Sequence, residues 1–243
     1  PDLPKHFIQT LALLQAKDPD GDIWQALESR HAEPHRHFHT LPYLAFRLDL
    51  LATTSHDTPH LRLALYFHHI IHDPCGENNE LQSARLATDL LSAIDVADKH
   101  TAVIYDLIRI TDPLPSPAIE HGDLFADLHL AWLGSRPDQF HHFSNALRQE
   151  FDWLPDTKYL RQRMNEVLPL LDRNPLFQTT DFQTRFEQQS RTNLTAEITR
   201  LRGDGPFPTT PQTVKGYQPV PEGLGTVAGG TTTGSHRRLE EHP

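Results

Sequence analysis

Histidine residues are the side chains of this 243-residue sequence that most clearly point to chemistry. There are 17 of them, and several stand in short runs at positions 35–39, 68–72 and 141–142. Histidine is the commonest metal ligand in proteins and the side chain that titrates nearest to neutral pH. The bunching therefore predicts a site built from imidazole rings, with a metal ion as its first candidate occupant.

Three separate segments hold the potential ligands: Glu33–Leu41, Ala64–Ala84 and Phe125–Gly134. They resemble the HD superfamily of metal-dependent phosphohydrolases. The likeness is greatest to small bacterial members with an Arg-x-Tyr-His-Thr-Leu entry, an HD dipeptide, an Asn-Glu-x-x-Ser-Ala helix and an Asp-Ala-Asp-Leu-x-x-Leu-Gly segment. It extends in order over roughly residues 22–201, and it implies a helical HD-type fold.

The family's metal set is His…His-Asp…Asp, and the resemblance maps it onto this chain with two changes. His39 and His68 take the two histidine positions. His69 stands where the family has the aspartate after the second histidine. In the last motif Asp127 keeps the first aspartate, and His129 replaces the second. The implied ligands are thus His39, His68, His69 and His129, with Asp127 beside them.

The exchange of carboxylates for imidazoles changes which ion is expected. Two carboxylates neutralise a divalent ion and favour Mg²⁺ or Mn²⁺, whereas nitrogen ligands favour Zn²⁺, Ni²⁺, Cu²⁺ or Fe²⁺. We expect a divalent transition metal, with zinc, nickel, iron and manganese as candidates. His68 and His69 point about 100° apart on a helix, so both reach one ion only at a helix edge or kink.

A second register of the same motif is open. His72 and Asp73 form a literal HD dipeptide, one helical turn beyond His68. A site of His39, His72, Asp73 and Asp127 would restore the family's ligand chemistry. The direct mapping is favoured because the Asn-Glu-x-x-Ser-Ala motif keeps the family's distance from His68.

The resemblance also implies three residues that would act on the substrate or on water. Glu80 maps to an acidic residue that positions or deprotonates water in related enzymes, and Asp73 is a second proton acceptor. Arg36 maps to the family's arginine, whose planar fork matches phosphate oxygens. The alternative for Arg36 is an ion pair with Glu33 or another nearby carboxylate, without a role in binding phosphate.

Lys99, Arg109 and Arg148 are weaker candidates for binding a phosphate. Arg148 with Glu150, and Arg191 with Glu187, are predicted to form ion pairs on helix faces. Further histidines show no grouping in the sequence and are expected to be solvated: His6, His56, His60, His141 and His142.

Apolar residues recur at helical spacing through most of the chain, which predicts an all-α bundle over residues 1–203. Residues 204–243 are rich in Pro, Gly and Thr and show no periodicity, so we expect a flexible tail there. The expected helices cover about 3–16, 22–27, 40–52, 60–72, 79–94, 98–110, 123–134, 137–151, 157–171 and 181–202.

Charge and composition exclude several classes of protein. The net charge is −10 with no long basic run, which disfavours a nucleic-acid polymer as partner. The longest apolar runs are far too short to span a bilayer. The single cysteine, Cys75, excludes an internal disulfide and fits a reducing compartment, so the cytoplasm is the expected location.

Two functions follow from the sequence. In the first, the protein is a metal-dependent phosphohydrolase acting on a small phosphorylated substrate, a phosphomonoester or a nucleotide. In the second, it keeps the fold but has lost catalysis, and serves as a ligand-binding or regulatory module. The two aspartate-to-histidine changes are the feature that divides these hypotheses.

Overall fold

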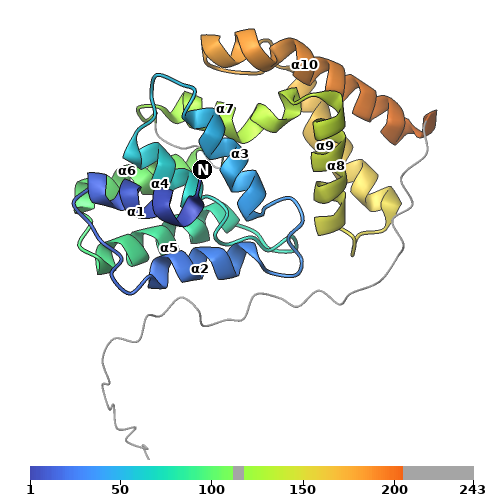
Figure 1. The fold of residues 1–243 in the computed structure, drawn as a ribbon. Coiled ribbons are helices and arrows are strands. Elements are labelled where there is room, and N and C mark those ends of the chain that lie inside the picture. Colours follow the sequence, from blue (N-terminus) through green and yellow to red (C-terminus); the bar gives the residue numbers. More distant parts are fainter. Residues whose placement is uncertain (112–117, 205–243) are drawn as a thin grey trace, which may run out of the picture.

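The computed structural model describes residues 1–111 and 118–204 (Figure 1). This part of the chain contains α-helices and short 3-10 or π turns, without strands, so the prediction of an all-α fold is confirmed. The predicted tail covers residues 204–243, of which Asp204 ends a short π turn that follows the last helix and 205–243 lie outside the described residues. The helices are α1 (Leu3–Leu13), α2 (Asp22–His31), α3 (Leu41–Leu51), α4 (Pro59–Phe67), α5 (Asn79–Ala93), α6 (Asp98–Ile108), α7 (Gly122–Leu130), α8 (Pro137–Glu150), α9 (Asp156–Asp172) and α10 (Thr180–Thr199).

Local signals in the sequence explain where several helices begin. Proline stands in the first turn of α1, α3, α4 and α8, where its missing N–H costs nothing. The side chain of Asp2 caps α1, and that of Thr58 caps α4. The expected helices agree closely with the observed ones, with α4 as the main exception because it ends at Phe67 instead of continuing to residue 72.

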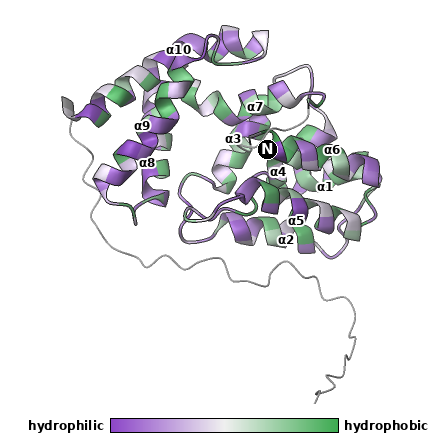
Figure 2. Ribbon diagram, turned by 180° about the vertical axis from the view of Figure 1, so that it is seen from behind, coloured by the Kyte–Doolittle hydropathy of each residue, from purple (hydrophilic) through white to green (hydrophobic). Residues whose placement is uncertain are grey.

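The helices form two unequal groups (Figure 1). Helices α1 to α6 lie together, with α6 packed against both α4 and α5. Helices α8, α9 and α10 lie on the other side, where α10 packs against the short turn Ala131–Gly134 that follows α7. Figure 2 shows that α8, α9 and α10 are more hydrophilic than α4 and α6. Both groups nevertheless bury large aromatic side chains completely: Phe7, Tyr66 and Phe67 around α4, and Phe140, Phe177 and Phe182 in the group of α8 and α10.

One of the two predicted surface ion pairs is present. Arg191 contacts Glu187 at 2.7 Å within α10. The predicted pair of Arg148 and Glu150 is wrong: Arg148 contacts Asp156 instead, because Glu150 points into the core. No helix within the described ranges is both long and apolar enough to cross a bilayer.

Candidate metal centre

The site begins where α4 ends. His68 is the C-cap residue of α4, and residues 68–72 form a non-helical turn. Because the helix ends here, the rings of the adjacent residues His68 and His69 lie close together, with centroids 3.9 Å apart. The end of α4 therefore provides the helix edge at which two adjacent histidines can approach one ion.

Arg36 holds this turn in place. Its guanidinium donates to the carbonyl oxygens of His69 and Ile70, and its Nε donates to Glu33 at 2.9 Å. The residue is only 5% exposed. The structure thus places Arg36 beside the histidines, as the resemblance implied, but its donors are directed to protein oxygens instead of to a phosphate.

The residues of the Asn-Glu-x-x-Ser motif support the same turn. The Ser83 hydroxyl accepts from the backbone N–H of Ile71 and donates to the carbonyl of the same residue. The Asn79 side chain exchanges two hydrogen bonds of 3.0 Å with the backbone of Asp73. This motif therefore fixes loop geometry, and Glu80 stands half-buried between these two anchors in the first turn of α5. The Asp73 carboxylate accepts from the backbone N–H of Cys75.

Two overlapping groups of histidines result. In each group, one ring nitrogen of every member lies within 4.8 Å of those of the others. The first group, here called the Glu150 group, consists of His39, His69 and His72. The second, here called the Arg47 group, consists of His68, His69 and His129. Each name refers to the charged residue that contacts the group.

Glu150 is the last residue of α8, and its carboxylate is fully buried. One oxygen accepts from the backbone N–H groups of residues 37, 38 and 39 at 2.7–3.0 Å. The other oxygen contacts Nδ1 of His39 at 2.6 Å and Nε2 of His72 at 2.9 Å. Burial alone would raise the pKa of Glu150, but the interactions of its carboxylate with His39 and His72 outweigh burial and hold this pKa well below its usual range.

An ionised Glu150 determines which nitrogens carry the protons. A carboxylate only accepts hydrogen bonds, so Nδ1 of His39 and Nε2 of His72 are both N–H groups. In the metal-binding form of each ring, the lone pair then lies on Nε2 of His39 and on Nδ1 of His72. In metal sites, a ligating histidine commonly donates the N–H of its other ring nitrogen to a carboxylate.

Arg47 imposes the opposite arrangement on the second group. This arginine of α3 is 1% exposed, and it donates to Nδ1 of His68 at 2.9 Å and to the carbonyl of Leu65. Because guanidinium has no lone pair to offer, Nδ1 of His68 must accept, and Nε2 must carry the proton that faces Thr111 at 2.6 Å. Neither ring nitrogen of His68 is then available to an ion.

His69 and His129 have nitrogens that the protein does not use. Nε2 of His69 and Nδ1 of His129 are buried and have no hydrogen-bond partner among the described residues. Buried polar atoms of this kind are uncommon and call for an explanation such as an unseen ion or water. His69 belongs to both groups, so its unpartnered nitrogen fits a metal ion held with either one.

Burial keeps these rings neutral. It lowers the pKa of His39 to about 4, with Glu150 acting in the opposite direction, and that of His129 to about 3, with Arg47 adding to the effect. For His68 and His69 burial, followed by the neighbouring charges, lowers the pKa well below the ordinary value. Neutral imidazole is the form that binds a metal ion.

Asp127 is not brought into either group. Its carboxylate accepts from the backbone N–H groups of Gln178 and Thr179, and from the Thr179 hydroxyl, at 2.7–2.8 Å. Thr179 is the N-cap residue of α10, so Asp127 fixes the start of that helix on α7. The structure therefore gives this predicted ligand a structural position.

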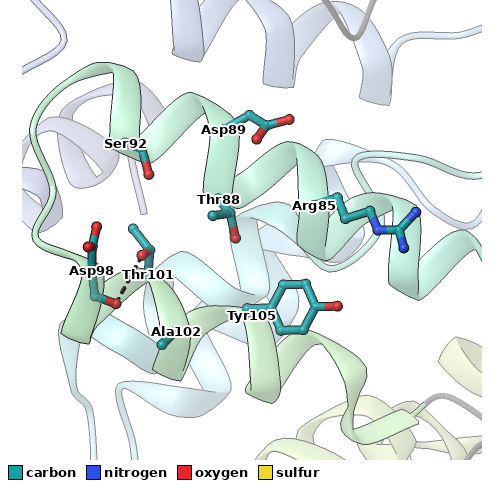
Figure 3. A pocket seen from close by; sticks show the side chains of 8 residues that line it. All are labelled: Arg85, Thr88, Asp89, Ser92, Asp98, Thr101, Ala102 and Tyr105. Carbon is teal, nitrogen blue, oxygen red and sulfur yellow. Dashed lines mark hydrogen bonds between the residues drawn. The ribbon is translucent and has the colours of Figure 1, made fainter.

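The histidines lie below the surface rather than in an open pocket. His39, His69 and His72 are 8%, 6% and 7% exposed. A hollow of about 540 Å³ lies elsewhere, between α5 and α6, and Arg85, Asp89 and Tyr105 are among the residues that line it (Figure 3). None of the predicted site residues lines it.

Glu150 and Arg47 are site residues that the sequence analysis did not identify. Both continue an apolar stripe on their own helix. Glu150 follows Phe140, Phe143 and Leu147 on α8, and Arg47 lies beside Leu44 on α3. A charged residue at a core-facing position of a helix was the signal that could have found them.

No protein-family model, curated protein or solved structure matches this chain.

Proposed function

We propose that this protein binds a divalent transition metal ion through His39, His69 and His72, on a helical scaffold related to the HD phosphohydrolases. The observation that carries the proposal is the pairing of Glu150 with His39 and His72 beside the unpartnered Nε2 of His69. Glu150 supplies a buried negative charge next to these rings, which offsets part of the charge of an ion.

The donor set fits zinc, nickel or iron better than magnesium. Three imidazole nitrogens are ligands of intermediate softness, and no carboxylate stands among the three. A bound ion with three protein ligands supplies Lewis acidity and lowers the pKa of a water molecule. Manganese, which prefers oxygen ligands, is the weakest of the expected candidates.

Hydrolysis of a phosphomonoester or nucleotide is the reaction we propose for an active form. In this form Glu150 orients His39 and His72, while Asp73 and Glu80, on the segment that follows His72, are the acidic residues proposed to accept a proton. Arg36 is engaged with the turn at residues 68–70, so the substrate phosphate needs another cation.

The same engagement of Arg36 supports the second candidate, a module that has kept the fold and binds a metal or ligand without catalysis. A cation that binds phosphate must present its donors to the substrate, whereas those of Arg36 bind carbonyl groups. Burial of the three ligands favours this candidate too, because a substrate must approach the ion closely.

The test is the metal content of the full-length protein, purified without an affinity tag and dialysed against zinc, nickel, iron or manganese. We expect His69→Gln to bind about one equivalent less than the wild type, and His68→Gln to bind as much as the wild type. His68 is the matched control because both of its ring nitrogens are already occupied by Arg47 and Thr111.

Phosphatase assays of the loaded protein then separate the two candidates. Turnover of p-nitrophenyl phosphate or a nucleoside monophosphate that disappears in His69→Gln supports the hydrolase. Metal binding without turnover supports the binding module. Equal metal content in the wild type and His69→Gln contradicts the proposed site altogether.

A further inference from the structure

A second group of histidines lies where α4, α6 and α7 begin. His60 is the second residue of α4, and His100 is the third residue of α6. Nε2 of His60 lies 2.8 Å from Nδ1 of His100, and the ring centroids are 5.0 Å apart. The expectation that His60 is a solvated surface residue is therefore wrong, since it is half-buried and paired across two helices.

Two more side chains of suitable chemistry stand at the same end of these helices. His121, the N-cap residue of α7, has its ring centroid 5.0 Å from that of His56, which is exposed as expected. Glu120 lies 3.7 Å from Nε2 of His121. The charges of His121 and Glu120 both influence the pKa of His60.

The close approach of His60 and His100 is what a chelating pair requires. The contact needs one ring to donate and the other to accept, so it cannot form between two protonated rings. Burial, followed by the charge of His100, lowers the pKa of His60, which keeps that ring neutral near pH 7. Two imidazole nitrogens on one tetrahedral ion are about 3.3 Å apart, so the pair must open by about 0.5 Å, and each ring must turn so that its lone pair points at the ion.

A metal ion can also replace the proton shared by His60 and His100 without changing the charge of either ring. The ring that donates in the pair has a free lone pair on its other nitrogen. When an ion takes the place of the shared proton, that proton moves to the other nitrogen, and the ring stays neutral. No proton therefore has to leave either ring at neutral pH.

We propose that His60 and His100 bind a second divalent transition metal ion, of the zinc, copper or nickel class, with His121 and Glu120 as its outer ligands. The first two nitrogens are already adjacent. Glu120 is 88% exposed and His121 is 26% exposed, so both side chains have room to turn toward the ion. The site shares no residue with the Glu150 group and is independent of the proposed function.

The helix termini explain why a carboxylate is needed. The N-terminal ends of α4 and α6 carry partial positive charge, which opposes a cation. The charge of Glu120 acts on His60 in the opposite direction to that of His100. Imidazoles alone would leave the ion uncompensated, and Glu120 supplies the missing negative charge.

Zinc binding by the full-length chain tests this site. All samples carry His236→Gln and His242→Gln, so that the C-terminal histidines do not contribute, and His69→Gln, which removes the first site. We expect one equivalent of zinc in equilibrium dialysis. In histidine-selective NMR, zinc should shift the resonances of Nε2 of His60 and Nδ1 of His100.

Further replacement of His60 or His100 by glutamine should weaken zinc binding by more than about tenfold. Glutamine keeps a hydrogen-bonding side chain at each position, and circular dichroism checks that the fold is intact. The matched control is His142→Gln, at an exposed histidine of α8, which should leave zinc binding unchanged.

No zinc binding in the His69→Gln background, or equal binding after His60→Gln, overturns the inference. The failure of the first site has a different signature. In that case the wild type and His69→Gln bind the same amount of zinc, whatever happens at His60.

Discussion

The Glu150 group and the Arg47 group share His69 and lie side by side, but the charged residue behind each is of opposite sign. Glu150 accepts hydrogen bonds from His39 and His72, whereas Arg47 donates one to His68. The first arrangement leaves lone pairs free on the far side of the rings, and the second consumes one. The number of nearby imidazoles therefore does not decide where an ion binds.

The charge itself adds to this difference. A buried carboxylate next to an ion compensates its charge, while a buried guanidinium repels it. Arg47 also lowers the pKa values of His68 and His129, after burial, whereas Glu150 raises that of His39 against burial. The two groups should thus respond differently to acid, to loss of their charged neighbour and to metal.

Acid has the largest expected effect. Buried neutral histidines have folded-state pKa values below 6.5, so the unfolded chain takes up protons first as the pH falls. The free energy of unfolding is therefore greatest above pH 6.5 and decreases by up to about 1.4 kcal/mol per pH unit for each such histidine. Those concerned are His31, His39, His68, His69 and His129.

Urea unfolding at pH 7, 6 and 5 measures this loss. His69→Gln should reduce the dependence of the free energy of unfolding on pH by the contribution of one histidine. In an NMR titration, His39, with a pKa of about 4, should protonate before His129, with a pKa of about 3. Stability that is unchanged between pH 7 and pH 5 would contradict the burial of neutral rings.

Glu150→Gln should have the next largest effect. The amide keeps one acceptor for the N–H groups of residues 37–39 but offers a donor to His39 and His72, whose protons must then move to their other nitrogens. We expect the free energy of unfolding to decrease by about 3 kcal/mol and metal affinity to decrease roughly 10- to 100-fold. Urea unfolding and zinc titration measure the two quantities.

Glu197→Gln is the matched control for this change. Glu197 is also a buried carboxylate, but it pairs with Arg163 and Ser144 at 2.9 and 2.7 Å. Its replacement should destabilise the protein and leave metal affinity unaltered. A Glu150→Gln protein that binds zinc as well as Glu197→Gln does would show that Glu150 has only a structural role.

Arg47→Met should have the smallest effect, and its sign is opposite. Removal of the guanidinium frees Nδ1 of His68 and raises the pKa of His68 and His129. We expect the Arg47 group to bind zinc about tenfold more tightly than before, so that His68→Gln now weakens binding. Arg47→Lys keeps the positive charge and should bind zinc as the wild type does. Equal zinc affinity in the wild type, Arg47→Met and Arg47→Lys would contradict the proposed role of the charge at position 47.

The sequence by itself determined the helices and the region of the site. Apart from the end of α4, apolar spacing placed the helices within a few residues of their observed bounds, because that pattern is local and is imposed by burial of one face. It also directed attention to His39, His68, His69 and His129, which the structure brings to the end of α4.

Only the tertiary structure decided which of these histidines can act and how. Glu150 reaches His39 across 111 positions of sequence, Arg36 is directed to the carbonyl groups at 69 and 70, and Asp127 is turned to the start of α10. The protonated nitrogen of an imidazole is set by the partner on its other side. That partner comes from another helix, so the spacing of residues along one segment carries no information about it.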